Sequence, residues 1–185
     1  SSIGRGVGER VAVTALRRAT PDDWRAYRAL RLRSLELAPD AFGSTLDAES
    51  PQPDEWWRGR LATSHTLLAE VDGVAGGIGT GIRDRHEIGS REIVGLWVEP
   101  EFRGRGIARE MIETLAVWAR DAAAHAIALW VSDGNPARRV YERAGFVATG
   151  ERDVVRGTLM EERMRRTLER SEPQETPGWR SGGVV

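Results

Sequence analysis

The apolar run REIVGLWV (91–98) and the segments after it constrain the fold more than any other part of the sequence. The run leads into an amphipathic segment, GIAREMIETLAVWARDAAA, and then into a second apolar run, AIALWVS (126–132). The two runs predict buried strands. The segment between them predicts a helix because apolar residues recur at spacings of three and four, at Ile107, Met111, Leu115 and Trp118. Strand, helix and strand in this order predict a helical crossover within one sheet.

The flanking sequence adds hairpins to this crossover. HTLLAEVDG (65–73) ends in an Asp-Gly turn and predicts a hairpin into VAGGIGTGIRD. Upstream, VAVTALRRA (11–19) predicts a strand, Thr20 followed by Pro21 predicts a helix start, and PDEWWRGRLAT predicts a second helix after a loop at 40–53. Downstream, NPARRVYERAG (135–145) predicts a short helix, and FVATGERD and TLMEERMRRTL predict two strands. The order indicates an α/β layout of the α+β type around a mixed sheet.

Composition bounds the domain organisation and the function classes. We expect a flexible arm at 1–10, one domain at 11–168 and a disordered tail at 169–185. The 27 basic and 28 acidic residues give a net charge of −1, which predicts no nucleic-acid or membrane partner. The sequence has no apolar run of bilayer length and no signal-peptide core at its start, which predicts a cytoplasmic protein.

Two residue types are missing, and their absence excludes several kinds of chemistry. Without cysteine, the chain has no disulfide, thiolate nucleophile or cysteine-bound metal. Without lysine, because every cation is arginine, it has no Walker-type phosphate loop and no Schiff-base mechanism.

A glycine–arginine turn, VEPEFRGRGIARE (98–110), opens the predicted crossover helix. Gly104 and Gly106 lose more backbone entropy on folding than other residues would, so their presence requires a reason. A helix N-terminus presents unpaired N–H groups and the positive end of the helix dipole, and it therefore binds phosphate. Glycines would let the backbone approach the phosphate oxygens, while Arg103 and Arg105 would add charge. The alternative is a turn that is merely tight and exposed.

The run LWVEPEFRGRGIARE resembles the acetyl-coenzyme A signature of the GNAT superfamily of N-acetyltransferases. Arg103, Gly106 and Ala108 occupy its signature positions, and NPARRVYERAGF (135–146) is similar to the second motif of the family. The resemblance implies a GNAT fold, with a mixed, mostly antiparallel sheet of about seven strands flanked by four helices. It also implies acetyl-CoA as the acetyl-donor cosubstrate, without a metal.

The same resemblance assigns residues to the coenzyme. Amides of residues 104–108 would hold the pyrophosphate, and the strand end would run along the pantetheine arm, with the Val98 amide donating to the thioester oxygen. The implied coenzyme-binding residues are Leu96, Trp97, Val98, Arg103, Gly104, Arg105, Gly106, Ile107, Ala108 and Asn135. The Asn135 contact is in question because the family usually places one residue more between this asparagine and the motif tyrosine.

Tyr141 and Glu92 are the implied catalytic residues. Tyr141 matches the family's general acid, and its alternative role is a core aromatic beside Phe146. Glu92 lies in a Glu-Ile-Val context like that of the histone-acetylating branch and would relay a proton from the substrate ammonium, directly or through water. Strand alternation predicts that it shares a face with Val94, Leu96 and Val98. Its alternative is a strand-end glutamate paired with Arg91 or Arg83.

Other patterns carry weaker signals. GGIGTG (76–81) lacks a following helix, so it predicts a strand whose glycine face has room for substrate rather than a dinucleotide loop. His65, His86 and His125 have no metal-ligand spacing. The acids Glu49, Asp84 and Glu87 are candidates for attracting a cationic amine. Trp56 and Trp57 predict packing of a helix on the sheet, and the alternative is that one of them lines the acceptor pocket. ERMRRTLER predicts a solvated strand face.

The sequence therefore predicts an acetyl-CoA-dependent N-acetyltransferase that transfers the acetyl group directly to a primary amine. The amine belongs to a small molecule or a protein, and a homodimer is possible within this family. Two other interpretations stay open. One is a coenzyme A-binding regulator without catalysis, and the other is a nucleotide-binding α/β protein unrelated to acetyl transfer.

Overall fold

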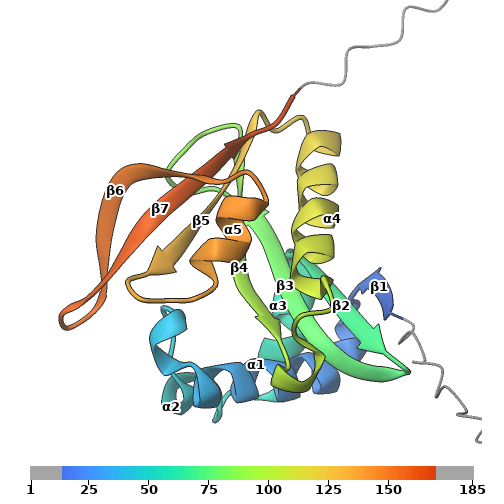
Figure 1. Ribbon diagram of the computed structural model, residues 1–185. Coiled ribbons are helices and arrows are strands. Elements are labelled where there is room, and N and C mark those ends of the chain that lie inside the picture. Colours follow the sequence, from blue (N-terminus) through green and yellow to red (C-terminus); the bar gives the residue numbers. More distant parts are fainter. Residues whose placement is uncertain (1–13, 170–185) are drawn as a thin grey trace, which may run out of the picture.

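The computed structural model describes residues 14–169 (Figure 1). The predicted arm at 1–10, residues 11–13 of the first predicted strand, and residues 170–185 of the predicted tail lie outside the described residues. In chain order the elements are β1 (Thr14–Arg18), α1 (Trp24–Leu37), α2 (Leu46–Glu49), α3 (Asp54–Thr63), β2 (His65–Val71), β3 (Val74–Arg83), β4 (Ser90–Val98), α4 (Ile107–Asp121), β5 (Ala126–Ser132), α5 (Arg138–Arg143), β6 (Val147–Arg156) and β7 (Leu159–Thr167).

The strands form one seven-stranded sheet in the order β1-β2-β3-β4-β5-β7-β6. All neighbouring strands are antiparallel except β4 and β5, which α4 joins as a crossover. The predicted mixed, mostly antiparallel sheet of seven strands flanked by helices is confirmed. The predicted loop at 40–53 differs in detail because it contains the short helix α2, whose first turn is capped by the Thr45 hydroxyl, which accepts from the Ala48 amide at 3.2 Å.

Helix α1 begins where the sequence predicted. A 3-10 turn, Pro21–Asp23, precedes it, and the Asp23 carboxylate accepts a hydrogen bond from the Thr20 amide at 2.7 Å. The same carboxylate binds the Arg17 guanidinium through two oxygens, at 2.8 and 2.9 Å. The helix start is therefore tied to strand β1 as well as to its own first turn.

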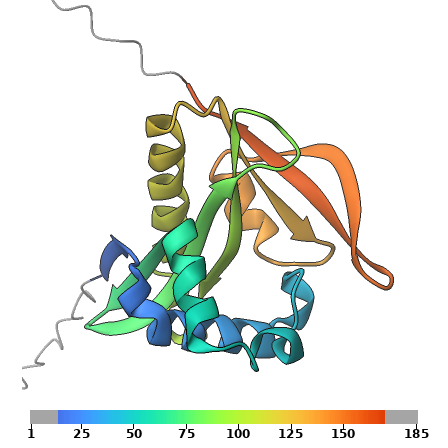
Figure 2. The same cartoon turned by 180° about the vertical axis from the view of Figure 1, so that it is seen from behind.

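Helices cover both faces of the sheet (Figures 1 and 2). Helices α4 and α5 pack on one face, in a core cluster that contains Met111, Leu115 and Tyr141. Helices α1 and α3 pack on the other face, where Trp57 is fully buried and meets Trp56 and Tyr27 edge-to-face. The predicted packing of the tryptophan pair against the sheet is confirmed for Trp57.

The glycines of β3 make room for α4, not for a substrate. A Cβ on Gly81 would lie 2.4 Å from the Trp118 ring, and one on Gly79 would lie 2.8 Å from Leu96 and 3.2 Å from Met111. Real Cβ atoms do not approach other heavy atoms so closely in packed interiors. The prediction that this glycine face accommodates substrate was wrong, because side chains of α4 and β4 fill it.

Strands β4 and β5 pair at one end and separate at the other. Ser90, Arg91 and Glu92 pair with residues 126–128, and beyond Glu92 no further β4 residue has a partner on β5. Strand β4 nevertheless continues to Val98 and β5 to Ser132. One edge of β4 from residue 93 onward is therefore open within the described sheet.

Candidate functional site

The open edge of β4 presents main-chain groups at its end. Val98 pairs with Gly77 of β3, and the Glu99 amide donates to the Gly76 carbonyl across that pair at 2.9 Å. The position of this bond shows that Val98 and Gly77 themselves exchange no hydrogen bond, because in an antiparallel ladder the bonds flank such a pair. The amide and carbonyl of Val98 therefore point away from β3, toward the open edge. The Val98 carbonyl accepts from Arg103 Nε at 2.9 Å. Within residues 14–169 no acceptor is found for the Val98 amide.

The N-terminus of α4 comes directly after this strand end and presents further donors. The first hydrogen bond at this end runs from the Glu110 amide to the Gly106 carbonyl, at 3.0 Å. Among the described residues, the amides of 104–109 find no hydrogen-bond acceptor. Gly104 and Gly106 have φ values of 77° and 83°, and a Cβ on either would meet no atom of the described residues within 4 Å. The glycines are therefore required by the left-handed backbone, and the space outside them is open.

The two arginines of the turn have different settings. Arg103 is exposed, and its guanidinium carbon lies 4.6 Å from the centre of the Trp97 ring. Arg105 is exposed and donates to the Glu101 carbonyl at 3.3 Å. Arg103 thus fixes the strand end, whereas Arg105 adds positive charge at the mouth of the turn.

Tyr141 lies on α5 and belongs to the same core cluster as Val98 and Ile107. Its side chain is 8% exposed, and its ring meets Phe146 edge-to-face at 6.3 Å. Burial raises the pKa of the Tyr141 hydroxyl to about 12. The described residues include no hydrogen-bond partner for this hydroxyl. Tyr141 is thus a core aromatic with a free polar tip, and its two predicted roles are compatible.

In this structure the side chain of Asn135 makes a hydrogen bond within its own turn. Its side-chain oxygen accepts from the Ala137 amide at 2.9 Å, which stabilises the turn that leads into α5. The side-chain amide is half-exposed and has no partner within residues 14–169. The predicted contact of Asn135 with a coenzyme stays a prediction.

A β-bulge in β4 changes which residues share a face. Ile78 pairs with Trp97, whereas Thr80 pairs with Val94, so Gly79 alone opposes Gly95 and Leu96. Gly95 has a φ of 62°, as expected of the glycine in such a bulge. The bulge reverses the alternation. Glu92 and Val94 therefore share a face with Trp97, and the prediction that they share it with Leu96 and Val98 was wrong.

The reversal sends the side chains around the open edge in two directions. Leu96 packs with α4, where the methyl of Met111 and Leu115 lie close to the Gly79 position. Trp97 is 7% exposed on the opposite face, and it meets Phe42 of the loop before α2 edge-to-face at 6.4 Å. Its indole N–H is buried and has no hydrogen-bond partner among the described residues. Ile107 is also a core residue, so only its main chain faces the turn.

Glu92 is half-buried and unpaired. Within residues 14–169 its carboxylate takes part in no hydrogen bond or ion pair, and Arg91 instead donates to the carbonyls of Ser90 and Ala122. The alternative pairing with Arg91 or Arg83 is therefore not found. Burial, and to a lesser degree the charge of Asp84, raises the pKa of Glu92, while His86, Arg163 and Arg85 act in the opposite direction.

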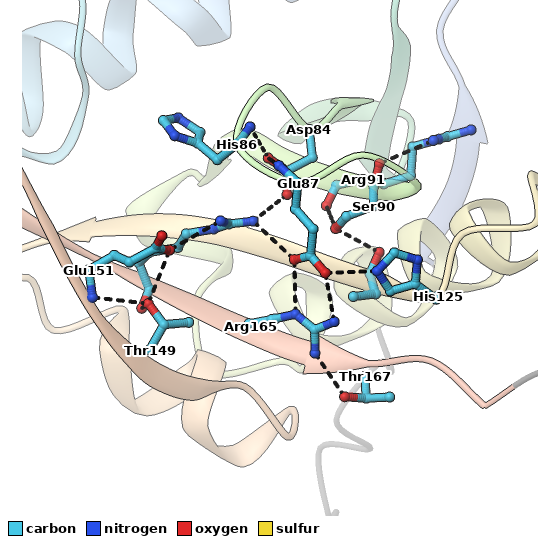
Figure 3. A network of polar contacts seen from close by, with 12 residues as sticks. Asp84, His86, Glu87, Ser90, Arg91, His125, Thr149, Glu151, Arg165 and Thr167 are labelled. Atoms are coloured by element: carbon cyan, nitrogen blue, oxygen red, sulfur yellow. Dashed lines mark hydrogen bonds and ion pairs between the residues drawn. The ribbon is translucent and has the colours of Figure 1, made fainter.

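The other candidate acids are held by arginines, and Figure 3 shows this for Asp84 and Glu87. Asp84, whose side chain is fully buried, accepts from Arg163. Glu87 binds Arg165 at 2.8 Å and His125 at 2.7 Å, and these partners lower its pKa to about 2. Glu49 is buried against Arg31 at 2.7 Å. These pairs neutralise the three acids, whereas Glu92 has no such partner among the described residues.

Sequence reasoning missed the role of Arg163. The run ERMRRTLER was predicted to form a solvated face, but Arg163 is only 4% exposed and contacts Asp84, Glu87 and Glu151. Arg166 likewise binds Glu113 of α4, at 2.7 Å. The alternating strand pattern does not distinguish a buried arginine from an exposed one, because the acids that neutralise it lie far away in sequence.

Two further features of the described residues bear on the class of site. No group of three histidine, aspartate or glutamate side chains among them is arranged to hold a metal ion. In this part of the chain, none of the helices combines the length and apolarity that crossing a membrane requires.

Comparisons with known proteins agree with this geometry. The chain is 38% identical over 69 residues to the uncharacterized N-acetyltransferase MJ1207 of Methanocaldococcus jannaschii, a match that spans 37% of this chain and 29% of that relative. The fold resembles an N-acetyltransferase from Staphylococcus aureus Mu50, with a TM-score of 0.73, 18% identity, and coverage of 85% of this chain and 99% of that one.

It also resembles yncA from Salmonella typhimurium, solved with its cofactor acetyl-CoA, with a TM-score of 0.69 and 22% identity. That likeness covers 89% of this chain and 99% of the other. The sequence profile of the "Acetyltransferase (GNAT) family" matches residues 24–146, which include the open strand edge, the glycine turn and Tyr141. The protein belongs to the GNAT family of acetyltransferases.

Proposed function

We propose that this protein transfers the acetyl group of acetyl-CoA directly to a primary amine. The observation that carries the proposal is that two neighbouring sets of main-chain donors have no acceptor among the described residues. The Val98 amide faces the open edge of β4, and the amides of residues 104–109 are free immediately after it. A thioester with a diphosphate at the far end of its carrier fits this arrangement, since each polar end of the ligand meets main-chain donors.

In the proposed complex, amides of residues 104–108 bind the pyrophosphate of the coenzyme. Arg105 contributes charge, and Arg103 supports the strand end by its bond to the Val98 carbonyl. The main chain of Leu96, Trp97 and Val98 pairs with the pantetheine arm as a neighbouring strand would. The likeness to yncA, which was solved with acetyl-CoA, supports this placement.

The Val98 amide donates to the thioester oxygen as negative charge develops on it during attack by the amine. A preorganised donor of this kind is typically worth about 2.7–4 kcal/mol in the transition state. The contribution is large because the amide has no competing acceptor among the described residues and needs no rearrangement at the moment of reaction.

Tyr141 protonates the departing thiolate. The pKa of the Tyr141 phenol is about 12, and that of a thiol in water is about 8.5. The difference between these pKa values makes the proton transfer uphill by roughly 5 kcal/mol. The same burial raises the pKa of the thiol, because desolvation disfavours the thiolate as it disfavours the phenolate. The difference between the two pKa values therefore becomes smaller when the thiol occupies the site, and the free hydroxyl of Tyr141 is available as the proton donor.

Glu92 accepts the proton of the substrate ammonium, directly or through water. The raised pKa of Glu92 lies closer to the pKa of the amine and makes the carboxylate a stronger base than that of an exposed glutamate. Among the described residues no arginine binds its carboxylate, so the carboxylate is available to accept a proton. The bulge places Glu92 on the face of β4 opposite α4, and the amine would approach from that face.

The alternative is a coenzyme A-binding regulator, and one observation favours it. Burial moves the pKa of Tyr141 away from that of a free thiol, which is expected of a tyrosine retained for packing. A regulator needs the open edge and the glycine turn but neither Glu92 nor the Tyr141 hydroxyl.

Two measurements test the proposal. Calorimetric titration should show binding of acetyl-CoA and weaker or no binding of ATP. Release of free coenzyme A should then be followed with a thiol-reactive dye over a panel of amines, from diamines and amino sugars to peptides. The sequence has no cysteine, so the dye reports the coenzyme alone. We expect turnover on at least one amine. Tight acetyl-CoA binding without turnover on any amine would favour the regulator, and a preference for ATP would contradict both functions.

A further inference from the structure

His86 lies in the loop between β3 and β4, and the chain holds its backbone in place. The Asp84 carboxylate accepts from the His86 amide at 2.8 Å and, through its other oxygen, from the buried guanidinium of Arg163 (Figure 3). Glu87, one residue further on, is bound by Arg165 of β7 and by His125. The loop is therefore fixed to the sheet on both sides of His86.

The imidazole of His86 lies on the same side of the sheet as Glu92. It contacts the Trp130 ring at 5.1 Å between centres, with the planes at 60°. Ala128 pairs with Glu92, and Trp130, two residues along β5, shares the face of Ala128. His86 is exposed, and its ring nitrogens have no hydrogen-bond partner within residues 14–169. Figure 3 shows its ring turned away from the network that holds its backbone.

A half-buried base must return its proton to water before the next turnover. The groups whose charges act on Glu92 are Asp84, His86, Arg163 and Arg85, and His86 also acts on Glu161 of β7, beside Asp153 of β6. The arginines cannot release a proton near neutral pH, and the Asp84 carboxylate is occupied by Arg163. Histidine is the side chain that gains and loses a proton in that range, and this one reaches solvent.

We propose that His86 carries the proton from Glu92 to solvent in each catalytic cycle, an inference that rests on the proposed amine acetylation. The substrate ammonium gives a proton to the Glu92 carboxylate. The carboxylic acid passes it, directly or through a bridging water, to the neutral imidazole, and the imidazolium releases it to bulk water. A second proton leaves the amine nitrogen after attack and balances the one that the thiolate takes up. Each acetyl transfer therefore releases one proton in total.

The first test is kinetic. His86→Ala should lower kcat about 100-fold, a typical contribution of positioned proton transfer, while KM for acetyl-CoA stays within about twofold. Added imidazole should restore most of the lost rate because it can occupy the vacated space. Ile88→Ala is the matched control, since Ile88 is in the same loop and is 99% exposed. An unchanged kcat in His86→Ala, or a loss that imidazole does not repair, would overturn the proposal.

The second test needs no substrate. Because His86 lowers the pKa of Glu92, the carboxyl carbon of Glu92 should titrate at a higher pH in His86→Ala than in the native protein. Its NMR signal is assigned by its loss in Glu92→Gln. An unmoved titration would show that the two side chains do not interact and would overturn the proposal.

The two tests separate this inference from the function on which it rests. An unchanged kcat in His86→Ala contradicts only the proton path through His86. Acetyl-CoA binding without turnover on any amine contradicts the proposed function and removes the proton path with it, even where the Glu92 titration shifts as expected.

Discussion

Tyr141→Phe should lower kcat about 100-fold and leave KM for acetyl-CoA within about twofold of the native value. The substitution removes one oxygen atom, and that oxygen has no hydrogen-bond partner among the described residues, so packing against Phe146 is kept. What is lost is the proton that the thiolate needs. Since the loss appears only in the transition state, it affects kcat rather than coenzyme binding. Steady-state assay of coenzyme A release measures both constants.

The chain provides a matched control for this substitution. It has two tyrosines, and Tyr27 is buried on α1, at 3% exposure, in the core cluster on the opposite face of the sheet. Tyr27→Phe should leave kcat within about twofold. The pH profile adds a further check. With a pKa of about 12, Tyr141 stays protonated up to that pH, so it should produce no fall in rate between pH 7 and pH 10. A Tyr141→Phe enzyme that keeps the native kcat would contradict the assigned role.

Gly106→Val should weaken acetyl-CoA binding about 100-fold. Gly106 has a φ of 83°, a conformation in which a β-branched residue is strongly strained, so the backbone of the turn should rearrange. The rearrangement turns amides of the turn away from the pyrophosphate. Losing one or two hydrogen bonds to a charged group costs about 1.5–3 kcal/mol each, which corresponds to roughly the expected loss of affinity. Calorimetric titration with acetyl-CoA measures it.

Gly73→Val is the control for backbone strain. Gly73 has a φ of 80° in the turn between β2 and β3, and, as at Gly106, a Cβ there would meet no atom within 4 Å in the part of the chain that the structure describes. Both variants should lose similar stability in denaturant unfolding, because both place valine in the left-handed region. Only Gly106→Val should lose affinity. Equal affinities in the two variants would show that the turn does not hold the coenzyme.

The sequence predicted the fold well where local patterns and topology agree. The spacing of Ile107, Met111 and Leu115 predicted α4, and all three side chains are buried. The mixed, mostly antiparallel sheet was likewise predicted from the hairpins and the helical crossovers between the strands. Positive φ at Gly104 and Gly106 gives a reason for glycine at the helix start that the sequence analysis did not give, because the left-handed backbone there favours glycine.

The faces of β4 were predicted wrongly because alternation was assumed to run unbroken. An isolated glycine within a strand often marks a bulge, and Gly95 was that signal. The bulge decides that Trp97, rather than Leu96, shares a face with Glu92. The buried Arg163 had no local signal at all. Its burial depends on Asp84 and Glu87, nearly eighty residues earlier in the sequence, and only the folded sheet brings them together.

A crystal structure of the complex with coenzyme A would locate the ligand on the protein. We expect pyrophosphate oxygens within hydrogen-bond distance of amides in the 104–108 turn, with the pantetheine arm along the open edge of β4 and its sulfur beside the Val98 amide and the Tyr141 hydroxyl. A coenzyme bound elsewhere, or one that leaves the Val98 edge empty and its sulfur remote from Tyr141, would rule out the proposed acetyl transfer at this site.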